Sequence, residues 1–209
     1  GLRVATIDPR YRLEGEADFF PVGSFYVLTF GEIQKQRFVP ALGFPPWKRI
    51  YGFRSDQRVE QLLAPIVAPR EILKIELLLE ANYHGDTVLC GFGPKREFLL
   101  ACSHAITPTG WDLVRERFGE RVIELSEHDA QRNGAISFTL TQGSDSLLLM
   151  PAGVSDRLLG QVRERGVTPV TVDVSEFLKK GGGSVKCMIG DLGPVEDSVS
   201  LGPLEFRGV

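Results

Sequence analysis

Residues Thr87 to Leu125 read TVLCGFGPKREFLLACSHAITPTGWDLVRERFGERVIEL, and this stretch carries the pattern that decides the fold. Two short apolar segments flank Gly93-Pro94, a pair typical of a tight turn, and together they predict a hairpin. The amphipathic segment that follows ends at Gly119, a residue that favours helix termination. The predicted order is strand, strand, helix, strand, over Thr87–Phe92, Glu97–Cys102, Thr109–Phe118 and Arg121–Leu125.

The same order recurs on both sides of this stretch, at a spacing of about 50 residues, which is typical of structural repeats. Upstream we expect strands at Leu2–Ile7, Gly23–Phe30 and Ile72–Leu79, the last of which a helix would also fit, and a helix at Gln57–Ile66 capped by Ser55 or Asp56. Downstream we expect the hairpin Ala135–Thr141 and Ser146–Met150, a helix from the cap Ser155 to Arg165 before Gly166, and strands Thr168–Val174 and Ser184–Ile189, with helical turns at Ser126 and Ser175–Lys180. No linker interrupts this pattern, so we expect a single domain over residues 1–209.

The composition is that of an ordinary globular protein. Of 209 residues, 43% are hydrophobic and 24% are charged, which argues against intrinsic disorder. The formal net charge of -3 excludes a broad basic face, so we expect no nucleic-acid partner. No apolar run approaches the roughly 20 residues that span a bilayer, so we also expect no membrane partner.

The three cysteines form an odd set that predicts reduced thiols and a cytoplasmic location. Cys102 and His104, with Cys90 nearby, match no closed zinc pattern, and we therefore expect no metal. Burial as small hydrophobic residues explains Cys90 and Cys102.

Cys187 follows Gly181-Gly-Gly-Ser-Val-Lys186. Three consecutive glycines favour a tight bend or the close approach of a ligand. The adjacent Lys186 would favour the thiolate form, which is the nucleophile. Cys187 is therefore a candidate catalytic nucleophile, and the alternative is an inert thiol in a strand after a glycine loop.

Three further segments carry candidate polar groups. His84 stands two residues before Asp86, so the carboxylate could orient the imidazole, although a surface histidine fits equally. Glu14, Glu16 and Asp18 lie on a glycine-containing turn, where they would bind a cation or be merely solvated. Arg54 could bind a carboxylate with its planar guanidinium, or be an exposed charge before a helix.

Together these segments resemble the guanidino-group-modifying enzymes, the pentein superfamily, over about Leu13 to Ile189. The matching segments are Leu13-Glu-Gly-Glu-Ala-Asp18, Tyr51-Gly-Phe-Arg-Ser-Asp56, Tyr83-His-Gly-Asp-Thr87 and Ser175-Glu-Phe-Leu-Lys-Lys-Gly-Gly-Gly-Ser-Val-Lys-Cys187. The second segment is most similar to the arginine dihydrolase branch. The resemblance implies an α/β propeller of strand–strand–helix–strand modules around a central active site.

The resemblance also implies a role for each matched residue. Cys187 would be the nucleophile that attacks the guanidinium carbon, and His84 the general acid and base. Asp86 and Glu14 would bind the guanidinium nitrogens, and Arg54 the α-carboxylate of the substrate. No cofactor is implied.

The chain departs from the family pattern at three points. Gly85 stands where relatives have a bulky apolar residue, so we expect a looser backbone between His84 and Asp86. Glu14 and Glu16 are two candidates for one role. Relatives also have a long stretch before the Glu-Gly segment, so we expect this domain to lack its first module.

Two functions of different classes therefore remain open. The first is a cysteine-dependent hydrolase of arginine or a derivative, with amidino transfer as a variant. The second is a non-catalytic propeller-like protein that binds a ligand or partner. In either case we expect a small guanidino ligand, and association of the chain with itself or with a missing N-terminal segment, because an incomplete ring exposes strand edges.

Overall fold

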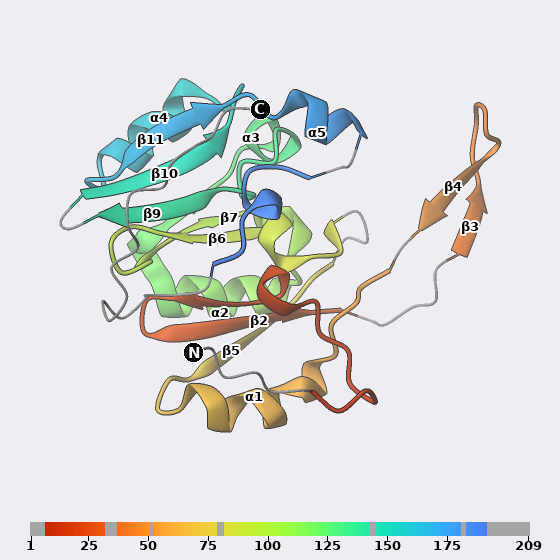
Figure 1. The fold of residues 1–209 in the computed structure, drawn as a ribbon, viewed down its shortest axis with the longest axis horizontal. Helices are drawn as coiled ribbons and strands as arrows, with labels where there is room; N and C mark the ends of the chain where they lie inside the picture. Colours follow the sequence, from red (N-terminus) through yellow and green to blue (C-terminus); the bar gives the residue numbers. More distant parts are fainter. Residues whose placement is uncertain are drawn as a thin grey trace, which may run out of the picture.

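Three small sheets, each with a helix in its last connection, make up most of the molecule (Figure 1). The computed structural model describes residues 7–31, 37–50, 52–78, 82–142, 145–180 and 183–191. In every three-stranded sheet the middle strand pairs antiparallel with one neighbour and parallel with the other. The predicted strand–strand–helix–strand unit is thus present three times in these ranges, and the fold is mixed α/β.

Each module takes its four main elements in chain order. The first contains β1 (Phe19–Val22), β2 (Phe25–Phe30), α1 (Glu60–Val67) and β5 (Ile72–Glu76). The second contains β6 (Leu89–Phe92), β7 (Phe98–Ala101), α2 (Pro108–Phe118) and β8 (Val122–Glu124). The third contains β9 (Phe138–Gln142), β10 (Asp145–Pro151), α4 (Asp156–Arg163) and β11 (Thr168–Val172), and the short helices α3 (Glu127–Gln131) and α5 (Ser175–Lys180) precede and follow it.

Local sequence signals explain where these elements begin and end. The Ser155 side chain accepts a hydrogen bond from the backbone of Leu158 and caps α4, as predicted. Gly119 ends α2 with a φ of +52°. A residue with a side chain would adopt this φ only at a steric cost. Asp56, rather than Ser55, caps the helical segment before α1 by accepting from the backbone of Arg58.

The core lies where the three sheets meet. Strand β6 lies beside β1 on one side and β9 on the other, so the first strand of each module faces the middle of the molecule. The side chains of β7 are among the most buried, with Leu99 and Leu100 fully enclosed. Short 3₁₀ helices, Gly15–Ala17 and Gly85–Thr87, lead into β1 and β6 and lie in contact at the same end of these inner strands.

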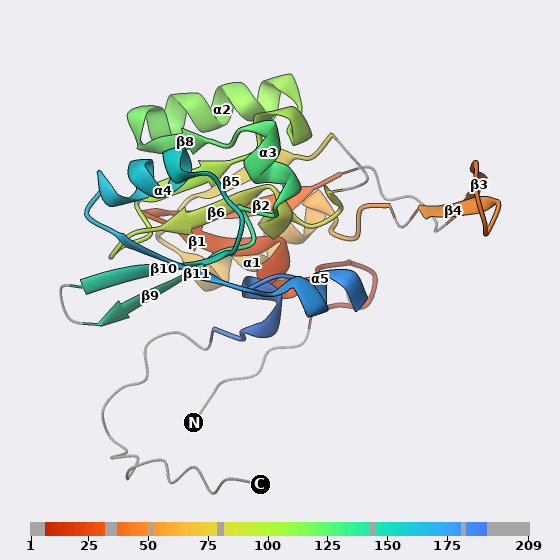
Figure 2. The same ribbon diagram turned by 90° about the horizontal axis from the view of Figure 1, so that it is seen from above.

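One hairpin stands apart from the modules. Strands β3 (Arg37–Pro40) and β4 (Trp47–Ile50) pair only with each other among the described strands, and they project away from the body (Figure 2). Apolar side chains on this arm are strongly exposed: Phe38, Leu42, Phe44 and Trp47. The local sequence pattern predicts neither this hairpin nor strand β1, in which Pro21 weakens the strand signal.

The predicted strand Ser184–Ile189 is wrong. Residues Lys186–Met188 form a 3₁₀ helix, because the amides of Cys187, Met188 and Ile189 bond to carbonyls three residues earlier. Ser184 and Val185 are still buried, which explains the strand-like apolar pattern. The predicted strand at Leu2–Ile7 lies outside the described residues except for Ile7, which is not in a strand.

No strand pairing joins one three-stranded sheet to another within the described ranges. The closed propeller therefore stays a prediction. The structure does not test the predicted lack of a first module. In the part of the chain that the structure describes, no helix combines the length and apolar character needed to cross a membrane.

Candidate active site

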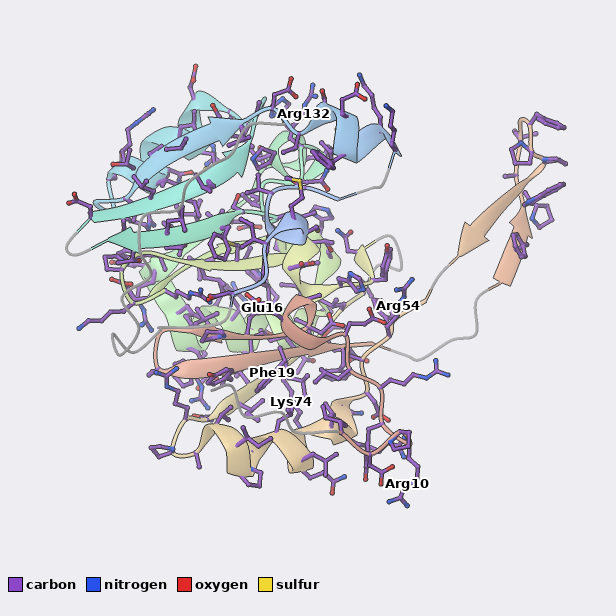
Figure 3. All side chains as sticks on the ribbon, in the orientation of Figure 1. Arg10, Glu16, Phe19, Arg54, Lys74 and Arg132 are labelled. Atoms are coloured by element: carbon purple, nitrogen blue, oxygen red, sulfur yellow. The ribbon has the colours of Figure 1, made fainter. Side chains whose placement is uncertain are left out.

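The candidate site forms where the first and second modules meet. The Gly15–Ala17 turn closes through a hydrogen bond from the Asp18 amide to the Gly15 carbonyl (3.1 Å), and Gly15 has a φ of +62°. The equivalent turn before β6 closes from Val88 to Gly85 (2.9 Å). Figure 3 shows Glu16 and Arg54 at the level where these two modules meet.

Glu14 lies between two predicted site residues. Its Oε2 atom is 3.5 Å from Nε2 of His84 and 3.6 Å from an amino group of Arg54. The Arg54 guanidinium also lies 5.0 Å from the centre of the Tyr83 ring, which contacts the imidazole of His84 edge-on. The sequence did not predict that Tyr83 lies against both Arg54 and His84. The structure brings Glu14, Arg54 and His84 together and leaves them partly open to solvent, as a substrate site requires.

Asp86 is almost fully enclosed, at 4% exposure. Burial raises the pKa of its carboxyl group, as do the charges of Asp18 and Glu16, while the charges of Lys186 and His84 act in the opposite direction. The Oδ1 atom is buried and makes no hydrogen bond within the described residues. Such an acceptor is ready to bind a donor that a ligand brings.

Lys186 lies inside the molecule beside the first module. Its ammonium group is 4.5 Å from the centre of the Phe20 ring and donates a hydrogen bond of 3.3 Å to the carbonyl of Glu16. The Glu16 carboxylate is 4.0 Å from this ammonium and also accepts from the amide of Asp191. Glu16 therefore contacts Lys186, whereas Glu14 contacts His84 and Arg54, which assigns the two glutamates to different neighbours.

Cys187 lies in the 3₁₀ turn that follows the glycine run, and it is exposed. Burial of the thiol by its neighbours raises its pKa, and the charge of Asp86 acts in the same direction. Lys186 lowers the pKa, as we expected from the sequence, but the net shift is upward. The negative charge of Asp86 therefore disfavours the thiolate form of Cys187.

The expectation of a loose backbone at Gly85 is wrong. This residue is buried, and its amide donates a 2.7 Å hydrogen bond to Oδ1 of Asp18. A Cβ atom placed on Gly85 would lie only 2.0 Å from Oγ1 of Thr29. Glycine is present here because Thr29 fills the space that a side chain would take.

Asp18 and Ser55 also belong to the surroundings of the site. The sequence predicted Asp18 only as one of three acidic residues that would bind a cation or be solvated, and Ser55 only as a candidate helix cap. Asp18 is 1% exposed and accepts hydrogen bonds from Thr29, Gly85 and Ser55. The Ser55 hydroxyl in turn accepts from the amide of Glu14 at 3.1 Å. The signal in the sequence is that Asp18 and Ser55 lie within the two segments that carry the family resemblance, Leu13–Asp18 and Tyr51–Asp56.

The other two cysteines are buried, as expected. Burial raises the pKa of Cys90 and of Cys102 to about 11 in each case. Sγ of Cys102 lies 3.4 Å from Nε2 of His104. Within the described ranges, no group of three or more histidine, cysteine or acidic side chains is arranged to hold a metal ion.

No protein-family model matches the chain. It is 30% identical over 144 residues to an N(G),N(G)-dimethylarginine dimethylaminohydrolase of Mycobacterium tuberculosis (strain ATCC 25618 / H37Rv). That alignment covers 69% of this chain and 44% of the mycobacterial protein.

Solved structures with the same fold include arginine dihydrolases. The substrate-bound N-terminal domain of ArgZ, from the ornithine–ammonia cycle in cyanobacteria, matches with a TM-score of 0.69 and 22% identity, over 89% of this chain and 59% of that domain. A variant of the same domain covalently bound to a reaction intermediate matches with a TM-score of 0.70 and 22% identity, over 90% and 59%. A complex of AgrE with L-arginine matches with a TM-score of 0.71 and 22% identity, over 92% of this chain and 25% of AgrE.

The chain therefore spans less than half of its mycobacterial relative and about three fifths of the ArgZ domain. The sequence similarity extends over 144 residues, and the fold match extends over nearly the whole chain. The homologues that share this sequence similarity and this fold, a dimethylarginine dimethylaminohydrolase and arginine dihydrolases, are guanidino-group-modifying enzymes of the pentein superfamily.

Proposed function

We propose that this chain carries the nucleophile and the acid–base group of a hydrolase that acts on arginine or an arginine derivative. The observation that carries the proposal is the contact between Glu14 and His84, which come from different modules; Asp86 and Cys187 complete the set that the family resemblance implies. A planar cation needs acidic acceptors on its nitrogens and a nucleophile above its carbon, and this set supplies both. The likeness to a dimethylarginine dimethylaminohydrolase and to arginine dihydrolases supports the same class of substrate.

In the first half of the reaction, the Cys187 thiolate attacks the guanidinium carbon. The carbon–nitrogen bond to the leaving amine then breaks, and His84 supplies the proton that the amine takes with it. The product of this half is an amidino-thioether on Cys187. Covalent trapping of an intermediate on the ArgZ domain supports this type of chemistry for that relative.

In the second half, His84 takes a proton from water, and the hydroxide attacks the same carbon. The carbon–sulfur bond breaks, the ureido product leaves, and Cys187 returns to its starting state. An amine in place of water would complete an amidino transfer instead. Hydrolysis is the version that the relatives' activities favour.

Because the pKa of Cys187 is raised, binding of the cationic substrate would help to form the thiolate that attacks it. Asp86 opposes the thiolate in the empty site. A guanidinium bound between Asp86 and Glu14 adds a positive charge next to the sulfur, and a nearby opposite charge favours the ionised form. Arg54 would bind the substrate's carboxylate. Its side chain, which is 3.6 Å from Glu14 without a ligand, would then move away so that Glu14 can bind the substrate's guanidinium.

Selective alkylation tests this proposal without requiring turnover. Chloroacetamidine is a small amidinium reagent, and chloroacetamide is its neutral counterpart of nearly the same shape. We expect the amidinium reagent to label Cys187 first, because the acidic acceptors bind it next to the sulfur. Cys90 and Cys102 should remain unlabelled, because burial raises the pKa of each to about 11. Peptide mapping by mass spectrometry identifies the labelled cysteine.

The Cys187→Ser variant is the control, and it should take up no amidinium reagent in the native state. Equal labelling of all three cysteines, or no preference for the amidinium over the amide at Cys187, would contradict the proposed site.

A second candidate function is binding of a guanidino compound without turnover. In its favour, the net shift of the Cys187 pKa is upward, a direction that disfavours the nucleophilic thiolate. Calorimetry with arginine, together with an assay for ammonia and ureido products, separates the two candidates. Heat of binding with no product supports the binding protein, and product that is lost in Cys187→Ser supports the hydrolase.

A further inference from the structure

Asp18 is a buried carboxylate to which the proposed chemistry gives no role. It is 1% exposed and lies in the loop between the Gly15–Ala17 turn and β1. Its Oδ1 atom accepts from the amide of Gly85 (2.7 Å) and the hydroxyl of Thr29 (2.8 Å). Its Oδ2 atom accepts from the hydroxyl of Ser55. Three donors from three separate segments therefore converge on one side chain.

Two of these donors sit directly beside proposed site residues. Gly85 is the single residue between His84 and Asp86, so the hydrogen bond from its amide sets the position of the backbone that carries both. Ser55 follows Arg54, and its hydroxyl also accepts from the amide of Glu14 at 3.1 Å. Asp18 therefore bonds directly to the backbone between His84 and Asp86 and, through the Ser55 hydroxyl, to the backbone amide of Glu14.

The third donor fixes how closely the modules approach. Thr29 lies in β2 of the first module, and its Oγ1 atom occupies the space where a Cβ of residue 85 would be. The Gly85 backbone can reach Asp18 only because it has no side chain. The contact between Thr29 and Gly85 and the bond from Gly85 to Asp18 thus set a single short separation between the two modules.

We propose that Asp18 is a positioning residue, which sets the distance between the acceptors Glu14 and Asp86 and so determines how well the site binds a planar cation. This inference rests on the proposed function, because it concerns the same site. Asp18 does not itself touch the substrate, since it is enclosed by its three donors. Its negative charge also contributes to the raised pKa of Asp86, although burial is the larger cause.

The substitution Asp18→Asn tests this role with almost no change of volume. An asparagine keeps one acceptor oxygen and replaces the other by an NH₂ group. Either the Gly85 amide then faces that NH₂ group, or the Ser55 hydroxyl loses its acceptor and must turn to accept from the NH₂ group instead. We expect the backbone at residue 85 to shift, and the separation of Glu14 and Asp86 to change with it. Small displacements of groups that must bind together have large effects on reaction rate.

Asp129 offers a matched control. It is also fully buried, and it accepts from the hydroxyl of Ser126 and from the amide and hydroxyl of Ser155. It joins α3 to α4 in the third module and touches none of the proposed site residues. Asp129→Asn therefore makes the same chemical change and disturbs the structure to a similar degree, at a different place.

The measurement is the ratio of the labelling rates of Cys187 by chloroacetamidine and by chloroacetamide. Asp18→Asn should lower this ratio on the order of 10- to 100-fold, because only the amidinium depends on the spacing of the acceptors. Asp129→Asn should leave the ratio unchanged even where it lowers the melting temperature. A residue that merely stabilises the fold would change both reagents alike, so an unchanged ratio in Asp18→Asn would overturn the proposal.

Two further readouts keep the test decisive. If Asp18→Asn does not fold, Ser55→Ala is the second variant. It removes the hydroxyl that joins Asp18 to the Glu14 amide and leaves the bonds of Asp18 to Gly85 and Thr29 in place. The ratio of labelling rates should fall while the fold persists, and an unchanged ratio would reject the proposal. Imidazole NMR signals give an answer independent of any ligand. Asp18→Asn should shift the signal of His84, whereas Asp129→Asn should shift that of His128, whose Nδ1 lies 3.5 Å from Asp129.

The NMR result also separates the two claims. A wild-type ratio that shows no preference for the amidinium refutes the proposed function. The positioning role is then decided by the imidazole signals alone, and a His84 signal that Asp18→Asn leaves in place refutes it.

Discussion

Asp86 and Asp129 are both buried aspartates, and their hydrogen bonding gives them opposite behaviour. Burial raises the pKa of Asp86, and its Oδ1 has no hydrogen-bond partner in the described part of the chain. Burial acts to raise the pKa of Asp129 too, but hydrogen bonds from Ser126 and Ser155 outweigh it and lower the pKa. A carboxylate that is buried without hydrogen-bond partners lowers the stability of the folded state, and such losses are typical of functional sites.

This contrast predicts opposite effects of the same substitution on the pH dependence of stability. Folding raises the pKa of Asp86, so its contribution to stability is present below the unfolded value of about 3.9 and is lost as pH rises through the folded value. Asp86→Asn removes that loss and should be more stable than wild type at pH 7, with a difference that shrinks toward pH 4. Urea unfolding at a series of pH values measures this.

Asp129→Asn provides the control of opposite sign. Folding lowers the pKa of Asp129, so its contribution is present above the unfolded value and is lost as pH falls through the folded one. This variant should lose about 1–3 kcal/mol at pH 7, the typical cost of removing a buried hydrogen-bond partner. If Asp86→Asn were destabilised at pH 7 as Asp129→Asn is, the account of Asp86 as an unfavourably buried carboxylate would be wrong.

At the scale of elements, the 3₁₀ turn Gly85–Thr87 has a tighter fit than its neighbour before β1. The turn at Gly15 needs glycine for its left-handed φ of +62° and has open space around it. The turn at Gly85 needs glycine for space, because Thr29 in β2 lies against it. The same residue type therefore serves two purposes in equivalent positions of two modules.

We predict that Gly85→Ala is strongly destabilising. The new Cβ would lie 2.0 Å from Oγ1 of Thr29 and force the turn away from β2. Inserting atoms into a packed interior typically costs about 1–3 kcal/mol. Denaturant unfolding measures the loss, and Thr29→Ala in the same chain should recover part of it by removing the nearest atoms.

The matched control is Gly160→Ala in helix α4, where a Cβ would meet no atom within 4 Å. Alanine is a better helix former than glycine, so this variant should gain roughly 0.5–1 kcal/mol. Equal stability of Gly85→Ala and wild type would show that the turn is loose, as the sequence first indicated.

At the scale of the whole molecule, the chain presents surfaces that an isolated globular protein usually covers. The outer edge of β11 pairs with no strand among the described residues. The β3–β4 arm carries Leu42 and Phe44 with practically their whole surfaces exposed. Large apolar side chains gathered on a projecting arm favour contact with another molecule.

We predict that the chain associates in solution and that the arm contributes to it. Size-exclusion chromatography with light scattering should give a mass above the 23.1 kDa of one chain. Replacing both Leu42 and Phe44 by serine should lower that mass while leaving the far-ultraviolet circular dichroism unchanged. Phe177→Ser, on α5 away from the arm, serves as the control and should leave the mass as in wild type. A wild-type mass of a single chain would contradict the prediction.

The module order was predictable because its signals are local. Hairpin turns, the cap at Ser155 and the stop at Gly119 each depend on a few neighbouring residues, and the structure confirms them. The closeness of Glu14, Arg54 and His84 follows from the family resemblance rather than from any local pattern. Local turn and capping signals therefore predicted the modules, and the family resemblance predicted the residues of the site.

Only the tertiary structure determined how these residues fit together. The bond from Gly85 to Asp18 spans 67 positions in sequence, and the one from Thr29 to Asp18 depends on which strands pair. The segment around Cys187 has the apolar pattern of a strand, but its amides bond to nearby carbonyls, so it forms a 3₁₀ helix instead. The sequence by itself predicted most helices and two of the hairpins, since their hydrogen bonds and turns are short-range, but not the β3–β4 hairpin or the turn at Cys187. The spacing of the site depends on contacts between distant segments, which no local pattern encodes.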